Sequence, residues 1–221
     1  MTLFQDIKNA NHIVIEFDVE FVASACALYT YVLQQHKKVS LVCGDDIDSK
    51  FSFLPWFDKI RKSGYSSADL VLPLNISALD LYEIFEKNSI KLNQKMATAF
   101  YAGLLVETKC FSANLDGTIF ATAKQLIDAK AEYKTCTKFI LNTKSLAYMR
   151  LKALMFNKML LKDDATLVVI DLSEDDLSKS GAKLSDAFEI LEESLSLVHV
   201  KKAELFKYEN NEILKSITKE I

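Results

Sequence analysis

Residues 12–43, HIVIEFDVEFVASACALYTYVLQQHKKVSLVC, decide the fold of this chain. The stretch begins with HIVI and ends with VSLVC, two short apolar runs of the kind that form buried strands. Between them, apolar side chains recur at Phe21, Ala25, Leu28 and Val32, which is the spacing of one face of an α-helix. The order of strand, helix and strand predicts two parallel strands joined by a right-handed crossover.

The residues that follow extend this pattern into a whole domain. ADLVLPL at residues 68–74 is expected to form a third strand, a short helix is expected around residues 57–62, and residues 77–162 read as almost entirely helical. We therefore predict a Rossmann-like α/β domain over residues 1–145, with a parallel sheet that is covered by helices on both faces.

A second domain is expected over residues 146–221, where the pattern changes. TLVVIDL has strand character, and a capping-box pattern runs from Ser173 to Asp176 at the start of the next helix. The sequence VHVKKAELFKYENNEILKSIT then predicts a hairpin that turns at Asn210-Asn211. The second domain is therefore of the α+β class.

The composition excludes several classes of function. The chain has 221 residues, with 27 Lys and Arg against 30 Asp and Glu, so its net charge of −3 does not favour nucleic acid as a partner. Only 5 residues are glycine, and no glycine-rich phosphate-binding pattern is present. The longest mostly apolar run, residues 21–33, is shorter than the roughly 18 residues that span a bilayer, so no membrane association is expected.

Cysteine usage and the start of the sequence indicate the compartment. Cys26, Cys43, Cys110 and Cys136 lie far apart and form no C-x-x-C pair, which fits reduced, buried thiols. The first residues lack the basic and then apolar segments of a secretory leader. We expect a cytoplasmic protein.

Polar side chains gather where the predicted parallel strands end, and this is the edge at which such sheets bind ligands. They are Glu16, Asp18 and Glu20 after the first strand, Asp45 and Asp46 after the second, and Asn75 after the third. Carboxylates at this edge would suit Mg²⁺ or Mn²⁺. Solvated loop acids are the simpler interpretation, and the spacing alone favours it.

Two other groups of residues carry weaker signals. His12, His36 and His199 are far apart, so histidine-based catalysis is not expected. The aromatic residues of segment 51–57 are expected to pack rather than to stack on nucleic-acid bases, because no arginine is interleaved with them.

Several blocks of the chain occur in the order of a known family. They are IKNANHIVIEF, DSKFSFLPW, ADLVLPLN, MATAFYAGLLVETKCF, LVVIDLSEDDLSKSGA and KKAELFKYENNEILKSI. Together these blocks resemble the DHH-family phosphoesterases of the oligoribonuclease and pAp-phosphatase type. The resemblance implies a parallel-sheet domain and a smaller substrate-binding domain with two manganese ions between them. It also implies hydrolysis of short oligonucleotides, nucleotide bisphosphates or cyclic dinucleotides.

The positions that carry the chemistry of this family are altered. The metal-binding loop is shorter here and lacks its histidine. Aligned from the following helix, Asp18 and Glu20 correspond to the D-x-D of this loop, whereas aligned from the strand Asp18 replaces the histidine. Asn75 stands where a ligand aspartate is expected, the D-H-H segment is missing, and Glu107 replaces another ligand aspartate. The sequence also stops before the R-S clamp and the G-G-G-H loop. The resemblance is therefore to a degenerate member with a truncated second domain.

These departures lead to two functional hypotheses. The first is a catalytically inactive, DHH phosphoesterase-like protein that acts as a cytosolic binding or scaffold partner. The alternative is a reduced phosphoesterase that hydrolyses a small nucleotide or short oligonucleotide, with one Mn²⁺ or Mg²⁺ held by Asp18, Glu20 and Glu107, because two ions would need a fuller ligand set. Whether Asp45 or Asp46 joins such a site stays open.

The expected partner is a second copy of this chain or another specific protein. The hairpin would leave a sheet edge, which tends to be paired or covered unless charges such as Lys215 blunt it. Loss of family segments would also expose apolar surface around Phe51, Phe53 and Trp56, and such patches commonly mark contacts.

Overall fold

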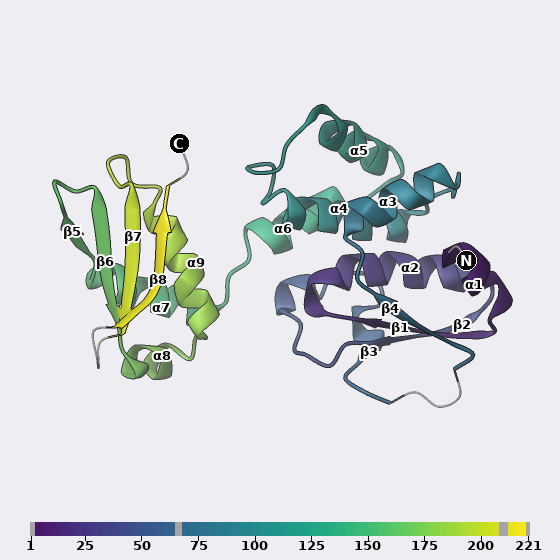
Figure 1. Ribbon diagram of the computed structural model, residues 1–221, viewed down its shortest axis with the longest axis horizontal. Helices are drawn as coiled ribbons and strands as arrows, with labels where there is room; N and C mark the ends of the chain where they lie inside the picture. Colours follow the sequence, from purple (N-terminus) through teal and green to yellow (C-terminus); the bar gives the residue numbers. More distant parts are fainter. Residues whose placement is uncertain (1–2, 65–67, 208–211, 220–221) are drawn as a thin grey trace. The chain divides into compact units, whose positions relative to one another are not determined.

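Strand β1 (His12–Phe17) lies inside a four-stranded sheet with the order β3-β2-β1-β4. Its parallel neighbours are β2 (Lys38–Val42) and β4 (Leu70–Leu74), so the three predicted strands are neighbours in one parallel sheet. This computed structural model describes residues 3–64, 68–207 and 212–219 (Figure 1). The chain forms two compact units, Met1–Thr143 and Lys144–Ile221.

One strand of this sheet was not predicted. The segment expected to be a short helix at residues 57–62 is a 3-10 turn, η3 (Phe57–Lys59), followed by β3 (Ile60–Arg61), which pairs in parallel with β2. A strand of two residues has no periodicity for a sequence reading to detect. The addition of β3 nonetheless places the residues after it at the same edge of the sheet as the ends of β1 and β2.

The first unit buries its core between the sheet and two layers of helices. Helix α2 (Val22–Gln34) has ten buried residues, because it lies between the sheet and α4 (Gln94–Glu107). A helix that is apolar on most sides is typical of such a sandwiched position. The remaining helices of the unit are α1 (Leu3–Asn9), α3 (Ala78–Lys87), α5 (Gly117–Asp128) and α6 (Tyr133–Leu141).

The helices of the first unit lie on one side of the sheet (Figure 1), so the expectation of helices on both faces was wrong. The reason lies in the connections. In the described residues, the links from β2 to β3 and from β3 to β4 contain only the short turns η2 (Ser49–Phe51) and η3. Val71 and Pro73, on the face away from α2, are accordingly exposed.

The aromatic segment belongs to the core. Phe51 is buried, and Phe53, Trp56 and Phe57 pack against the same cluster. The Phe53 ring also stacks on Phe139, with 5.2 Å between ring centroids. The packing interpretation is therefore confirmed, although Phe53, Trp56 and Phe57 are only half-buried.

The second unit is a mixed sheet with helices packed on it. The sheet order is β5-β6-β7-β8, and its strands are β5 (Leu160–Lys162), β6 (Leu167–Leu172), β7 (Lys202–Lys207) and β8 (Glu212–Thr218). Its helices are α7 (Leu146–Asn157), α8 (Glu174–Ser180) and α9 (Leu184–Ser194). Strand β5 was predicted as the end of α7.

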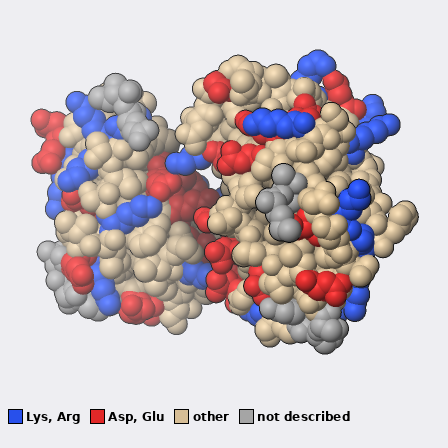
Figure 2. Space-filling view, turned by 45° about the vertical axis from the view of Figure 1, so that its right-hand side comes forward, with Lys and Arg blue, Asp and Glu red and all other residues tan. Residues whose placement is uncertain are grey.

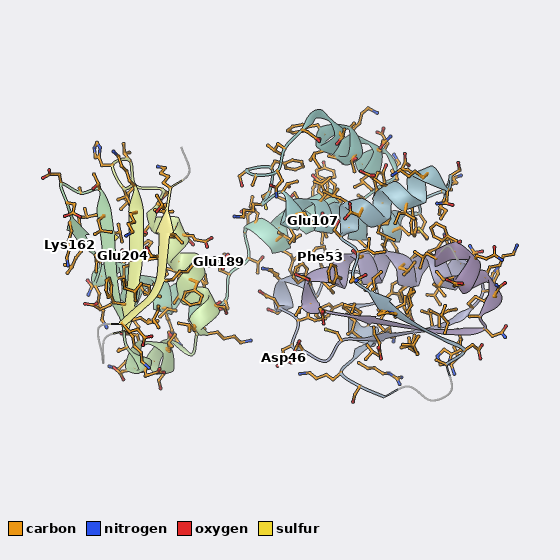
Figure 3. The ribbon with its side chains drawn as sticks, in the orientation of Figure 1. Asp46, Phe53, Glu107, Lys162, Glu189 and Glu204 are labelled. Atoms are coloured by element: carbon orange, nitrogen blue, oxygen red, sulfur yellow. The ribbon has the colours of Figure 1, made fainter. Side chains whose placement is uncertain are left out.

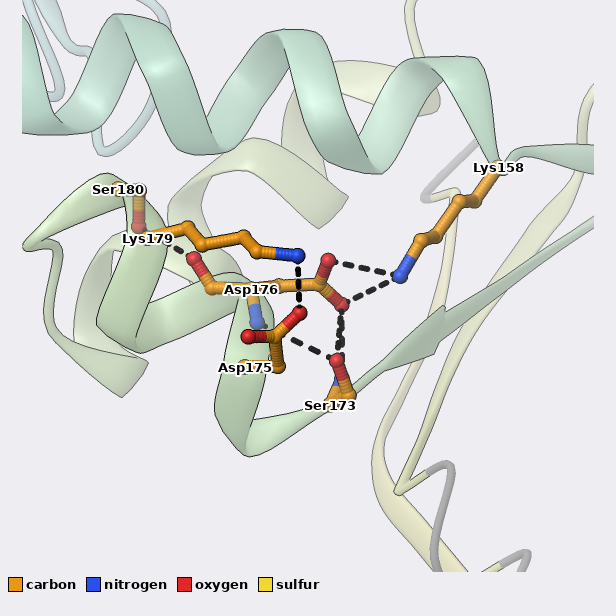
Figure 4. Close-up of polar contacts among 6 residues, drawn as sticks. All are labelled: Lys158, Ser173, Asp175, Asp176, Lys179 and Ser180. Carbon is orange, nitrogen blue, oxygen red and sulfur yellow. Dashed lines mark hydrogen bonds and ion pairs between the residues drawn. The ribbon is translucent and has the colours of Figure 1, made fainter.

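Strands β7 and β8 pair antiparallel, which confirms the hairpin. The predicted turn at Asn210-Asn211 lies outside the described residues. The predicted capping box is also present, since the Ser173 side chain accepts the Asp176 N–H while the Asp176 carboxylate accepts the Ser173 N–H (Figure 4). Together these features give an α/β chain with a Rossmann-like unit and an α+β unit.

The burial of the cysteines agrees with the prediction from the sequence. Cys26, Cys43 and Cys136 are buried, and Cys110 is half-buried. Among the described residues, no helix combines the length and the apolar character needed to cross a bilayer.

Candidate functional site

A cleft of about 500 Å³ opens at the edge where the strands of the first sheet end. Its lining comes from the ends of β1, β2 and β4 and from the residues after β3: Glu16, Phe17, Asp18, Val42, Gly44, Lys62, Ser63, Gly64, Pro73, Leu74 and Asn75. The chain leaves β1 toward β2 on one side and later returns to β4 on the other. Such a reversal in strand order is the point at which open parallel sheets bind ligands.

Three oxygen-bearing side chains converge on this cleft. Glu16 is half-buried and lies in register between Val42 and Pro73 on the face of the sheet away from α2. Asp18 follows the end of β1 and is exposed, and Asn75 follows the end of β4. Sequence reasoning therefore placed Asp18 and Asn75 correctly at one edge.

Asp18 has a side chain that the local fold does not use. It occupies the N-cap position of the 3-10 helix η1 (Val19–Phe21), but only its backbone oxygen takes part, accepting the Phe21 N–H at 2.9 Å. The carboxylate makes no capping hydrogen bond. The end of β1 therefore fixes the position of Asp18, while its carboxylate does not take part in capping η1.

Lys62 brings a positive charge to the rim of the cleft, and it is paired there. Its ammonium group forms an ion pair with the Asp46 carboxylate, and both side chains are mostly exposed (Figure 3 labels Asp46). The sequence reading missed Lys62, Ser63 and Gly64, because their position depends on the unpredicted strand β3. Asp46 belongs to this ion pair, and Asp45 is not part of the cleft lining.

Glu20 and Glu107 lie elsewhere, around a second and much smaller pocket. That pocket, of about 20 Å³, is also lined by Ala23, Ala78 and Gly103. A volume of this size holds about one water molecule. The structure therefore groups Glu20 with Glu107, and Asp18 with Asn75, in different pockets.

Glu107 is engaged at the start of a neighbouring helix. Its Oε1 accepts the Ala78 N–H at 2.7 Å, so the last residue of α4 caps the first turn of α3 (Figure 3). A carboxylate in this position satisfies an otherwise unpaired helix N–H and interacts favourably with the helix dipole. Burial nevertheless dominates, and it raises the pKa of Glu107 above its ordinary value despite the hydrogen bonds from Ala78, Leu79 and Ser77.

The carboxylates do not assemble into a metal centre. Among the described residues, no group of three or more His, Cys, Asp or Glu side chains is arranged to hold a metal ion. The two-manganese site that the family resemblance implies therefore does not fit these side chains. Binding of a single ion by Asp18, Glu20 and Glu107 would need their carboxylates to leave two separate pockets, and it stays a prediction.

Cys43, after the end of β2, is sensitive to the charges at this edge. Burial is the main cause that raises the pKa of this thiol, the nearby charges of Asp45 and Asp18 raise it further, and Lys62 acts in the opposite direction. In Figure 2, acidic side chains recur along one margin of the larger unit. The histidines are not in the cleft lining, so the cleft offers oxygen acceptors and apolar walls but no nucleophile paired with an imidazole base.

The fold has a counterpart among solved structures. An exopolyphosphatase-related protein from Bacteroides fragilis superposes with a TM-score of 0.76 at 14% sequence identity, over 95% of this chain and 79% of that one. The chain shares the fold of that protein. At such low identity the likeness concerns the fold and not the chemistry.

The other comparisons add little to this result. A family II inorganic pyrophosphatase from Methanococcus jannaschii matches at 15% identity over 89% of this chain and 83% of that one, but its TM-score of 0.35 is too low to support an argument. No protein-family model matches the sequence. No curated protein sequence matches it either.

Proposed function

We propose that this DHH-fold protein does not hydrolyse phosphoesters and acts instead as a cytoplasmic binding partner of a specific protein or of a second copy of itself. The observation that carries the proposal is the hydrogen bond from the Ala78 N–H to Glu107. The carboxylate that would replace a ligand aspartate of the family serves here as the cap of α3. Removing it from that position would leave the helix end unsatisfied.

The remaining side chains support the same proposal. Asn75, at the end of β4, is a neutral amide where the family resemblance implies a carboxylate, so the cleft has lost one negative charge that a divalent cation would need. Glu20 does not line the cleft that contains Asp18. Two-metal catalysis depends on ions held about 3.5–4 Å apart by a nearly complete ligand set, and these residues do not provide one.

A hydrolysis assay tests the proposal directly. The full chain would be incubated with Mn²⁺ or Mg²⁺ and with pAp, short oligoribonucleotides or inorganic polyphosphate, and release of phosphate or mononucleotide would be measured. We expect no turnover above that of the Asp18→Asn variant, which serves as the matched control because the Asp18 carboxylate makes no capping hydrogen bond.

Metal-dependent turnover that Asp18→Asn and Glu107→Ala both abolish would contradict the proposal and support the reduced phosphoesterase. Light scattering on the pure protein and co-purification from a native cytosol would identify the partner. A strict monomer that recovers no reproducible partner would contradict the binding function.

A further inference from the structure

The cleft at the end of the parallel strands has the lining of a binding site for an organic cation. Its volume of about 500 Å³ lies within the range of ordinary small-ligand pockets. Phe17, Val42, Pro73 and Leu74 give it apolar walls. Such walls favour a ligand with an aliphatic body over a fully hydrated inorganic ion.

The polar lining of the cleft is composed mainly of acceptors. Glu16 and Asp18 bring two carboxylates, and Asn75, directly after the adjacent strand β4, adds an amide oxygen. Glu16 is half-buried in register between Val42 and Pro73, and partial shielding from solvent strengthens the attraction of a carboxylate for a cation. The amide oxygen can accept a hydrogen bond from the same group.

The positive charge on the rim does not offset these carboxylates. The Lys62 ammonium group is paired with the Asp46 carboxylate, so the pair adds little net charge to the cleft. A phosphate group in this cleft would lie next to the carboxylates of Glu16 and Asp18, and its negative charge would be repelled by theirs. A bare divalent ion would find two carboxylates where six or more oxygen ligands are usual.

We propose that this cleft binds an alkylammonium or guanidinium group with a short aliphatic body, held by Glu16, Asp18 and Asn75. This inference rests on the proposed function, since it gives a binding role to an edge that lacks the metal centre. The same chemistry is found in free diamines and in the Lys and Arg side chains of a protein partner. Either source would place its nitrogen between the carboxylates and its methylene groups against Pro73 and Leu74.

Amide chemical shifts of the full chain provide the test. The free probes are putrescine and N-ethylguanidinium, and the side-chain probes are the peptides acetyl-Gly-Lys-Gly-amide and acetyl-Gly-Arg-Gly-amide, with acetyl-Gly-Gln-Gly-amide as the neutral control. We expect a saturable shift centred on the ends of β1 and β4 for the cations, weakened several-fold between 50 and 500 mM NaCl, as charge pairing requires. The neutral peptide should give none.

Variants separate the cleft from general charge. Glu16→Gln combined with Asp18→Asn should weaken cation binding about tenfold, because it removes both charged acceptors and keeps their shape. Asp58→Asn is the matched control, since Asp58 is exposed, pairs with Lys59 at 3.2 Å and lies outside the cleft, and it should bind as the wild type does. The amide spectrum of each variant also reports whether it folds.

Two results would overturn the inference: cation binding that is unchanged in the double variant, or no saturable shift with any cation at 20 mM. Tighter binding of the peptides than of the free probes would identify a protein side chain as the source, and the reverse would identify a free amine. Failure of the proposed function appears in a different assay, as Mn²⁺-dependent turnover, so the two failures are distinguishable.

Discussion

The Glu107 carboxylate accepts the Ala78 N–H at 2.7 Å, which ties the last residue of α4 to the first turn of α3. Ser77 caps the same turn from within the chain segment, accepting the Asp80 N–H at 3.1 Å. The start of α3 therefore has a local cap and a tertiary cap. The tertiary cap gives the carboxylate at residue 107 a structural role that does not depend on a metal ion.

Replacing Glu107 should therefore affect stability more than chemistry. Glu107→Ala should lower the free energy of unfolding by about 1 kcal/mol, the usual cost of losing a helix cap. Glu107→Gln keeps an oxygen that can accept the Ala78 N–H and should unfold close to the wild type. Urea unfolding followed by circular dichroism measures both. Equal losses in the two variants would show that the charge, and not the cap, is what matters.

The difference in stability between the wild type and Glu107→Gln should depend on pH. Because burial raises the pKa of Glu107 in the folded state, the protein favours its neutral form. The stability contributed by that neutral form is complete below the ordinary value of 4.5 and is lost as the pH rises through the raised value. The Gln variant cannot titrate, so its stability relative to the wild type should increase over this window. A constant difference from pH 4 to pH 8 would contradict this assignment.

Gly103 of α4 marks the closest approach between the helices beside this cap. A Cβ atom at Gly103 would lie 2.2 Å from the Ala78 Cβ and 3.3 Å from the Ala23 Cβ. Gly103→Ala should destabilise the first unit, because an overpacking cost of about 1–3 kcal/mol exceeds a gain in helix propensity of about 1 kcal/mol. Gly117→Ala is the control, since a Cβ there meets no atom within 4 Å. Thermal unfolding should separate the two variants, and equal midpoints would show that α3 can shift freely.

The sequence predicted the parts of the fold that repeat and missed those that do not. Strands β1, β2 and β4 of the first sheet carry several apolar residues each, and the Ser173 capping box joins neighbouring residues, so these predictions were correct. Strands β3 and β5 have two and three residues, and their pairing depends on neighbours that are remote in the sequence. Tertiary contact and not local pattern therefore determines them.

The candidate site divides in the same way. The sequence predicted that Asp18 and Asn75 lie at one edge of the sheet, because the carboxyl ends of parallel strands lie at the same edge. Lys62 could not be found, since β3 carries it there. The capping role of Glu107 was equally hidden, because the Ala78 N–H lies 29 residues away in the sequence and is brought close only by the packing of α3 on α4.

The second unit offers a prediction on a buried ion pair. Asp176 is almost fully buried, and its two carboxylate oxygens accept the Lys158 ammonium group at 2.6 and 2.7 Å and the Ser173 hydroxyl at 2.7 Å (Figure 4). Burial alone would raise the pKa of Asp176, but the hydrogen bonds from Lys158 and Ser173 hold it below its ordinary value. This carboxylate joins the end of α7 to the start of α8.

Asp176→Ala should therefore lower the free energy of unfolding by about 2 kcal/mol, because it removes a cap and leaves the Ser173 N–H and hydroxyl without their acceptor. Asp175→Ala is the matched control, since Asp175 pairs with Lys179 on the exposed side of the same helix, and it should cost about 0.5 kcal/mol or less.

Because the folded-state pKa of Asp176 is depressed, the stability that its carboxylate contributes is present above the ordinary value of 3.8 and is lost as the pH falls through the depressed value. Denaturant unfolding at pH 7 and at pH 3 should show the difference between wild type and Asp176→Asn shrinking at the lower pH. A difference that is unchanged, or equal losses for Asp175→Ala and Asp176→Ala, would show that the buried pair does not hold α8 in place.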